Sequence, residues 1–87
     1  MFIVKLRREG LPLEQAHVYS LAEASATVTA YQREFGLGAS QLADEHGEVR
    51  SVEDGAPTHW VSYNGRVWEL EPDTYGLWLG RLVYEPV

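Results

Sequence analysis

The first residues of the chain alternate between two kinds of side chain. Within residues 2–8, Phe2, Val4 and Leu6 fall on one side, and the other side carries Ile3, Lys5 and Arg7. A period of two is typical of a half-buried strand. We expect this strand to end within residues 9–12, because glycine and proline together interrupt a ladder of backbone hydrogen bonds.

A single helix is predicted over residues 21–35. Ser20 and Glu23 fit a capping box, in which each side chain bonds the backbone amide of the other residue. Gly36 suits the left-handed residue that ends a helix. Apolar residues recur every three or four positions and so form one stripe toward a core: Leu21, Ala24, Val28, Tyr31 and Phe35.

The dipeptide Asn64-Gly65 predicts a β-hairpin, because two alternating segments flank it. Asn-Gly accepts a positive φ at both central positions of a two-residue type I′ turn. Such a loop fixes the cross-strand pairs, which run from 63 opposite 66 to 59 opposite 70. Strands are therefore expected at 58–63 and 66–70, with a short strand at 48–52 and a last strand at 77–84.

The predicted element order is β-α-β-β-β-β. It corresponds to a two-layer α+β fold, with one helix packed on a mostly antiparallel sheet of four to five strands. The chain has 87 residues, too few for two hydrophobic cores, so residues 1–87 are expected to form a single domain. No stretch approaches the about 18–20 apolar residues that cross a bilayer, and the start lacks a secretory pattern. We therefore expect a cytoplasmic protein without membrane contact.

The predicted hairpin register gives the sheet two apolar faces. The face richer in large side chains includes Val61 and Leu70, and we expect it to lie beneath the helix. One helix covers only one face, so a second apolar surface remains on the outer side of the sheet. Its expected members come from the hairpin and the last strand: Trp60, Val67, Trp78 and Tyr84.

Three explanations for this outer surface remain open. Residues 9–19 and 37–47 can fold over it and complete the core. Alternatively, the four residues bind a second copy of the chain or another protein, because large exposed aromatic patches mark such interfaces. The third is a small-molecule pocket. Separately, for a pocket between helix and sheet, the candidate ligand-binding residues are His59, Tyr63 and Trp68.

Residues typical of catalysis or metal binding do not form a recognisable motif. The chain has no cysteine, and His17, His46 and His59 lie at none of the spacings of a metal site. His46 belongs to the one cluster of carboxylates and imidazole, residues 44–48, which is interpreted as a solvated turn because EF-hand spacing is absent. We therefore nominate no catalytic residue, no metal and no cofactor.

The charge balance disfavours nucleic acid as a partner. Thirteen acidic residues stand against seven basic ones, for a net charge of −6, whereas binding a phosphate backbone requires clustered Lys and Arg. With no enzyme motif, the sequence favours a non-enzymatic protein-association module that homodimerises through its sheet. The alternative is a small-molecule binding module with a pocket between helix and sheet.

Three stretches carry a resemblance: Ser20-Leu-Ala-Glu-Ala-Ser25, Phe35-Gly-Leu-Gly-Ala-Ser40 and Val61-Ser-Tyr-Asn-Gly-Arg-Val-Trp68. Together they resemble a group of small uncharacterised proteobacterial proteins, often carried on mobile elements of the plasmid, phage or integron-cassette type. The resemblance implies a bacterial, cytosolic α+β domain. It carries over no functional residue, because no catalytic residue is established for that group.

Overall fold

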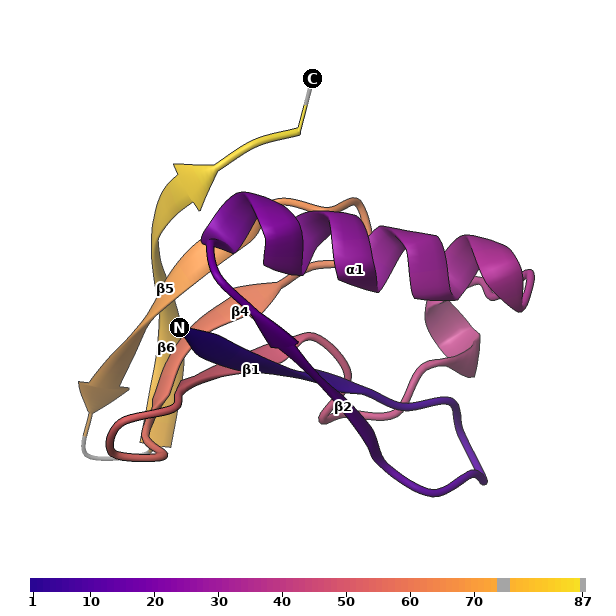
Figure 1. The fold of residues 1–87 in the computed structure, drawn as a ribbon, viewed down its shortest axis with the longest axis horizontal. Coiled ribbons are helices and arrows are strands. Elements are labelled where there is room, and N and C mark those ends of the chain that lie inside the picture. Colours follow the sequence, from indigo (N-terminus) through magenta and orange to yellow (C-terminus); the bar gives the residue numbers. More distant parts are fainter. Residues whose placement is uncertain (74–75, 87) are drawn as a thin grey trace.

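The computed structural model describes residues 1–73 and 76–86. Its elements are β1 (Phe2–Leu6), β2 (Glu14–Val18), α1 (Leu21–Glu34), the 3-10 turn η1 (Ala39–Gln41), β3 (Glu48–Ser51), β4 (Pro57–Val61), β5 (Val67–Asp73) and β6 (Gly76–Tyr84). The strands form one sheet in the order β2-β1-β3-β4-β5-β6, and all neighbours are antiparallel. Figure 1 shows α1 lying across one side of this sheet. The predicted α+β class, with one helix on an antiparallel sheet, is confirmed.

The prediction of four to five strands was wrong, because the sheet has six. The missed strand is β2, which pairs with β1 from Phe2 opposite Val18 to Leu6 opposite Glu14. As an edge strand it buries only Val18 fully, so its hydrophobic pattern is weak. The segment 9–19 was one candidate to cover the outer side of the sheet, but its strand β2 extends the sheet at the edge.

Helix α1 begins and ends close to the predicted positions. The Ser20 hydroxyl accepts a hydrogen bond from the Glu23 amide over 3.1 Å. The Glu23 carboxylate accepts from the Tyr19 amide, one residue before the predicted partner. At the other end, Gly36 has a φ of 61°, and the Leu37 amide donates to the Gln32 carbonyl over 2.9 Å. These bonds form the Schellman arrangement that ends many helices.

Phe35 was predicted on the core stripe, but it is 41% exposed. The helix ends at Glu34, and Phe35 adopts the non-helical φ of −99° at the C-cap, so its ring leaves the stripe. The Arg8 guanidinium lies 3.8 Å from the centre of this ring. A cation over an aromatic face therefore takes the place of the expected core contact.

The hairpin exists, but its predicted register was wrong by one residue. Trp60 lies opposite Trp68, and Val61 lies opposite Val67. No described residue other than glycine has a positive φ, which excludes the type I′ turn at Asn64. Residues 63–65 instead form a three-residue loop that closes with the left-handed Gly65, whose φ is 87°.

Helix α1 packs closely on the hairpin loop that has this register. The Ser25 hydroxyl donates to the Gly65 carbonyl over 2.6 Å. A Cβ at Gly65 would lie 3.1 Å from Ser25 Oγ and from the Thr29 side chain. The loop backbone therefore approaches α1 at a distance that a larger residue would not permit without movement.

The hydrophobic core lies between α1 and the sheet. Its buried members are Val4, Leu6, Val18, Ala24, Val28, Tyr31, Val49, Val61 and Val67. Phe2, Val83 and Tyr84 pack against this cluster from its margin. The placement of Val67 on the outer side of the sheet was therefore wrong, because the shifted register turns its side chain toward the helix.

Candidate functional site

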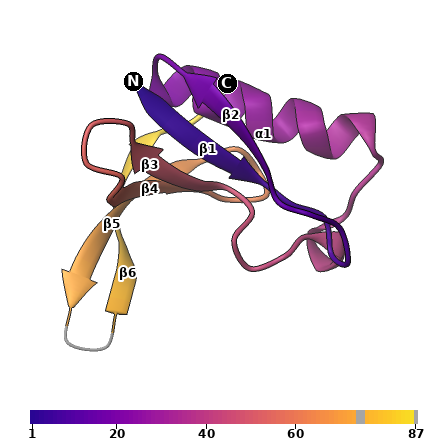
Figure 2. The ribbon, with the colours of Figure 1, turned by 60° about the horizontal axis from the view of Figure 1, so that its bottom comes forward.

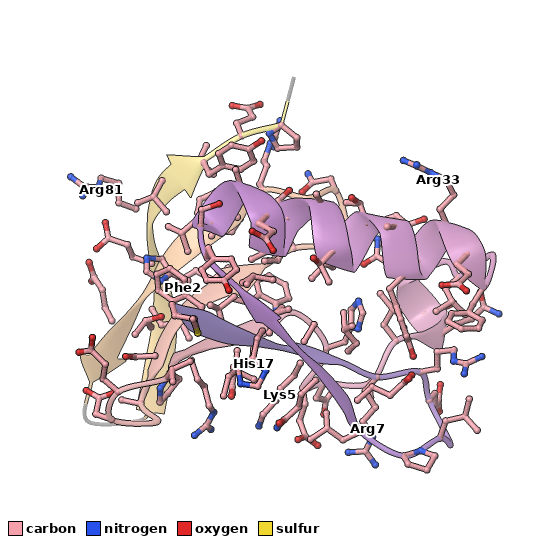
Figure 3. All side chains as sticks on the ribbon, in the orientation of Figure 1. Phe2, Lys5, Arg7, His17, Arg33 and Arg81 are labelled. Atoms are coloured by element: carbon pink, nitrogen blue, oxygen red, sulfur yellow. The ribbon has the colours of Figure 1, made fainter. Side chains whose placement is uncertain are left out.

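The side of the sheet opposite α1 is the main unoccupied surface of the fold. Within residues 1–73 and 76–86, no helix or strand lies over it (Figures 1 and 2). Figure 3 shows Lys5, Arg7 and His17 pointing away from α1, whereas Phe2 lies on the helix side. We call this surface the open face; register places on it Ile3, Lys5, His17, Glu48, Arg50, Trp60, Trp68, Leu70, Leu79 and Leu82.

One half of the open face is apolar. Across strands β4, β5 and β6, Trp60 lies opposite Trp68, and Trp68 lies opposite Leu82. A second pair, Leu70 opposite Leu79, continues the row along the hairpin. All five side chains retain exposed surface, and Leu79 is 49% exposed. Directly opposed aromatic and aliphatic side chains thus form a contiguous apolar patch.

The other half of the open face is ionic. Lys5 Nζ lies 3.2 Å from a Glu48 carboxylate oxygen and 3.6 Å from one of Glu45. Arg50 donates to Glu48, and Arg7 donates to Glu45. Burial alone would raise the pKa of Glu48, but the hydrogen bonds and charges of Arg50 and Lys5 outweigh it and hold this pKa below its ordinary value. The charges here are already paired within the chain.

The four predicted interface residues do not form one surface. Trp60 lies on the open face as expected. Val67 is fully buried on the helix side, and Tyr84, its cross-strand neighbour, packs against the core. The assignment of Val67 to the outer surface was wrong because it rested on the two-residue loop. That of Tyr84 was wrong because it assumed unbroken alternation in the last strand, whereas the pairing of β5 with β6 shifts between Val67 and Trp68. The side chain of Trp78 lies outside the described residues.

The three predicted ligand residues are not brought together either. His59 lies on the helix side of the sheet and makes an edge contact with Phe2, with ring centroids 5.9 Å apart. Burial lowers the pKa of His59, and the charge of Glu69 opposes this shift. Tyr63 lies in the hairpin loop with 48% of its surface exposed, and Trp68 lies on the opposite side of the sheet from His59.

His46 is the polar residue that the sequence interpretation placed wrongly. It was expected in a solvated turn, but it is 4% exposed. The Arg7 amide donates to its Nδ1 over 3.0 Å, so Nδ1 carries a lone pair and the proton resides on Nε2. Nε2 then donates to Gln32 Oε1 over 3.0 Å, and Gln32 Nε2 donates to the Tyr63 carbonyl over 2.9 Å. Burial lowers the pKa of His46, consistent with this neutral form.

A cavity of about 290 Å³ lies where the loop after η1 meets the end of β4. We call it the corner pocket; its lining is mostly apolar and consists of Ala39, Leu42, Ala43, Asp44, His46, Trp60, Val61 and Tyr63. Trp60 Nε1 donates to the His46 carbonyl over 3.1 Å and so joins the strand to the loop. Tyr63 is the only predicted ligand residue in this lining.

Comparisons with known proteins assign no family. A scan against protein-family models and searches of curated proteins and solved structures find no match to this chain. The resemblance to small proteobacterial proteins stays a prediction. In the part of the chain that the structure describes, no helix is long and apolar enough to span a membrane. No three His, Asp or Glu side chains of the same residues gather as metal ligands.

Proposed function

We propose that this chain is a protein-association module that pairs with a second copy of itself through the open face. The observation that carries this proposal is the row of Trp60, Trp68 and Leu82 across three neighbouring strands. Tryptophan is enriched among the residues that dominate binding energy at protein interfaces. An uncovered row of this kind gains free energy when a partner removes it from water.

The arrangement of polar groups around this row supports an interface. Lys5, Glu48 and Arg50 lie beside the apolar half and are paired with one another or with a neighbour. A stable interface has an apolar centre and a polar rim whose charges have partners. Because these pairs exist before association, burying the neighbouring apolar surface does not require breaking them.

The charge distribution favours a second copy over a basic partner. The chain carries a net charge of −6, yet the open face itself carries Lys5 and Arg50 against Glu48. Two copies can therefore bring their open faces together while their acidic surfaces stay apart. A two-fold axis through the apolar half would place Trp60 and Trp68 of one copy against those of the other, a self-complementary contact.

The available area is compatible with a dimer. A typical stable interface buries about 800 Å² on each partner, which is roughly one seventh of the 5465 Å² accessible surface of this chain. The open face spans six strands of a molecule measuring 34 × 28 × 22 Å. One side of such a sheet is large enough to supply that area.

The experiment that tests this proposal is the solution mass by light scattering over a concentration series. We expect a mass near twice 9.8 kDa at high concentration, falling toward 9.8 kDa on dilution. Quenching of tryptophan fluorescence by iodide should decrease over the same range as Trp60 and Trp68 become covered. A constant mass of 9.8 kDa would refute self-association.

A further inference from the structure

The few polar groups in the mostly apolar lining of the corner pocket already make hydrogen bonds. Both ring nitrogens of His46 are bonded, one to the Arg7 amide and one to Gln32. Trp60 Nε1 is bonded to the His46 carbonyl, and the Tyr63 hydroxyl reaches the Leu37 carbonyl over 3.4 Å. A ligand in this pocket therefore meets aromatic and aliphatic surfaces, with few available donors.

Asp44 is the exception. This residue lines the pocket and is exposed, and its side chain makes no hydrogen bond or ion pair with any other described residue. The carboxylate of the next residue, Glu45, forms ion pairs with Arg7 and Lys5. Asp44 therefore contributes a negative charge that forms no ion pair with a described residue.

We infer that the corner pocket binds a small organic cation, an ammonium group carried on a short apolar or aromatic body. Trp60 and Tyr63 supply aromatic rings, whose faces attract cations, and Asp44 supplies the opposite charge. Leu42 and Ala39 supply the apolar wall for the body of the ligand. His46, buried in its neutral form, adds no opposing positive charge.

The size of the pocket limits the ligand. Its volume of about 290 Å³ lies just below the roughly 300–1,000 Å³ that is usual for ligand pockets. An aromatic ring with one methylene and an ammonium is of suitable size, whereas a nucleotide is too large and carries the wrong charge. Trp60 belongs both to this pocket and to the open face, whereas Asp44 and Tyr63 belong to the pocket alone. The charge and the second ring of the site therefore do not depend on self-association.

The test uses benzylammonium as the probe and benzyl alcohol as its uncharged counterpart. Amide chemical shifts of the isotope-labelled protein are followed during titration at neutral pH. We expect saturable shifts with benzylammonium in residues 42–46 and 61–63, and weaker binding of benzyl alcohol. Asp44→Asn should weaken benzylammonium binding about five- to tenfold, while Glu53→Gln, the same charge change at an exposed turn residue, should not.

Three outcomes would overturn the inference. They are no saturable shift, equal binding of the alcohol and the ammonium, and unchanged binding by the Asp44→Asn variant. The amide spectrum itself reports whether each variant is folded, so loss of structure is separated from loss of binding. Failure of the dimer proposal would leave these results unaffected, because the titration is read at residues of the pocket.

Discussion

The imidazole of His46 donates from Nε2 to Gln32 Oε1 over 3.0 Å, and this contact joins the loop before β3 to helix α1. The same imidazole accepts from the Arg7 amide of the segment after β1. The same glutamine donates to the Tyr63 carbonyl of the hairpin loop. Two side chains thus connect four segments that are distant in sequence. The bond from the Arg7 amide requires neutral histidine, because a protonated Nδ1 cannot accept a hydrogen bond.

Acid should destabilise the fold through this histidine. The pKa of His46 is lowered in the folded state by burial, so the unfolded chain binds a proton more readily. Stability is fully present above the ordinary histidine pKa of 6.5 and falls as pH decreases below it. We therefore expect the urea concentration at the unfolding midpoint to decrease as the pH is lowered from 8 to 5, a range that brackets about 6.5.

Variants distinguish the contribution of His46 to this pH dependence from the contributions of the other histidines. His46→Gln should flatten the decrease, whereas His17→Gln, at an exposed position, should keep it. His59, whose pKa is also lowered by burial, contributes in the same direction. A His46→Gln variant with the wild-type dependence on pH would show that the imidazole does not titrate as described.

Truncation of the Gln32 side chain should destabilise the fold more than truncation of an exposed glutamine does. Gln32→Ala leaves the buried His46 Nε2 and the part-buried Tyr63 carbonyl without their partners. An unsatisfied buried polar group costs about 1–3 kcal/mol, so the free energy of unfolding should decrease by roughly 2–4 kcal/mol. Gln15→Ala, on an exposed strand position, should change it by less than about 0.5 kcal/mol. Equal effects of the two substitutions would contradict the network.

Gly47 should tolerate no side chain. Its φ is 90°, and a Cβ there would lie only 2.3 Å from the Val61 carbonyl oxygen. Gly10 has a similar φ of 80° but open space around it. Gly10→Ala should therefore cost about 1–2 kcal/mol from backbone strain alone, and Gly47→Ala clearly more. Thermal unfolding of both variants measures the difference in stability. Comparable losses of stability in Gly47→Ala and Gly10→Ala would contradict the close approach of Gly47 to the Val61 carbonyl.

Local signals made the helix and the existence of the hairpin predictable. The bond from the Glu23 amide to Ser20 and the left-handed Gly36 depend on residues within one turn of each other. Asn64-Gly65 likewise indicates a tight turn whatever surrounds it. Such interactions can be predicted without knowing the rest of the fold.

The features that the sequence interpretation missed depend on contacts between segments that are distant in the sequence. Asn-Gly is compatible with two hairpin loops, and the close approach of Ser25 to Gly65, forty residues apart, accompanies the longer one. His46 is buried by partners fourteen and thirty-nine residues away. Because the register sets which side chains share a face, one shifted pair moved Val67 into the core and Trp68 onto the open face.

The most direct test of the open face as a self-association surface compares two leucines. Leu79 is 49% exposed on the open face, and Leu11 is 41% exposed in the β1–β2 connection. Light scattering on the wild type, Leu79→Lys and Leu11→Lys, with circular dichroism to verify folding, measures the mass of each. We predict a mass near twice 9.8 kDa for the wild type and Leu11→Lys, and 9.8 kDa for a folded Leu79→Lys variant. A Leu79→Lys variant that remains dimeric, or a monomeric wild type, would contradict the account.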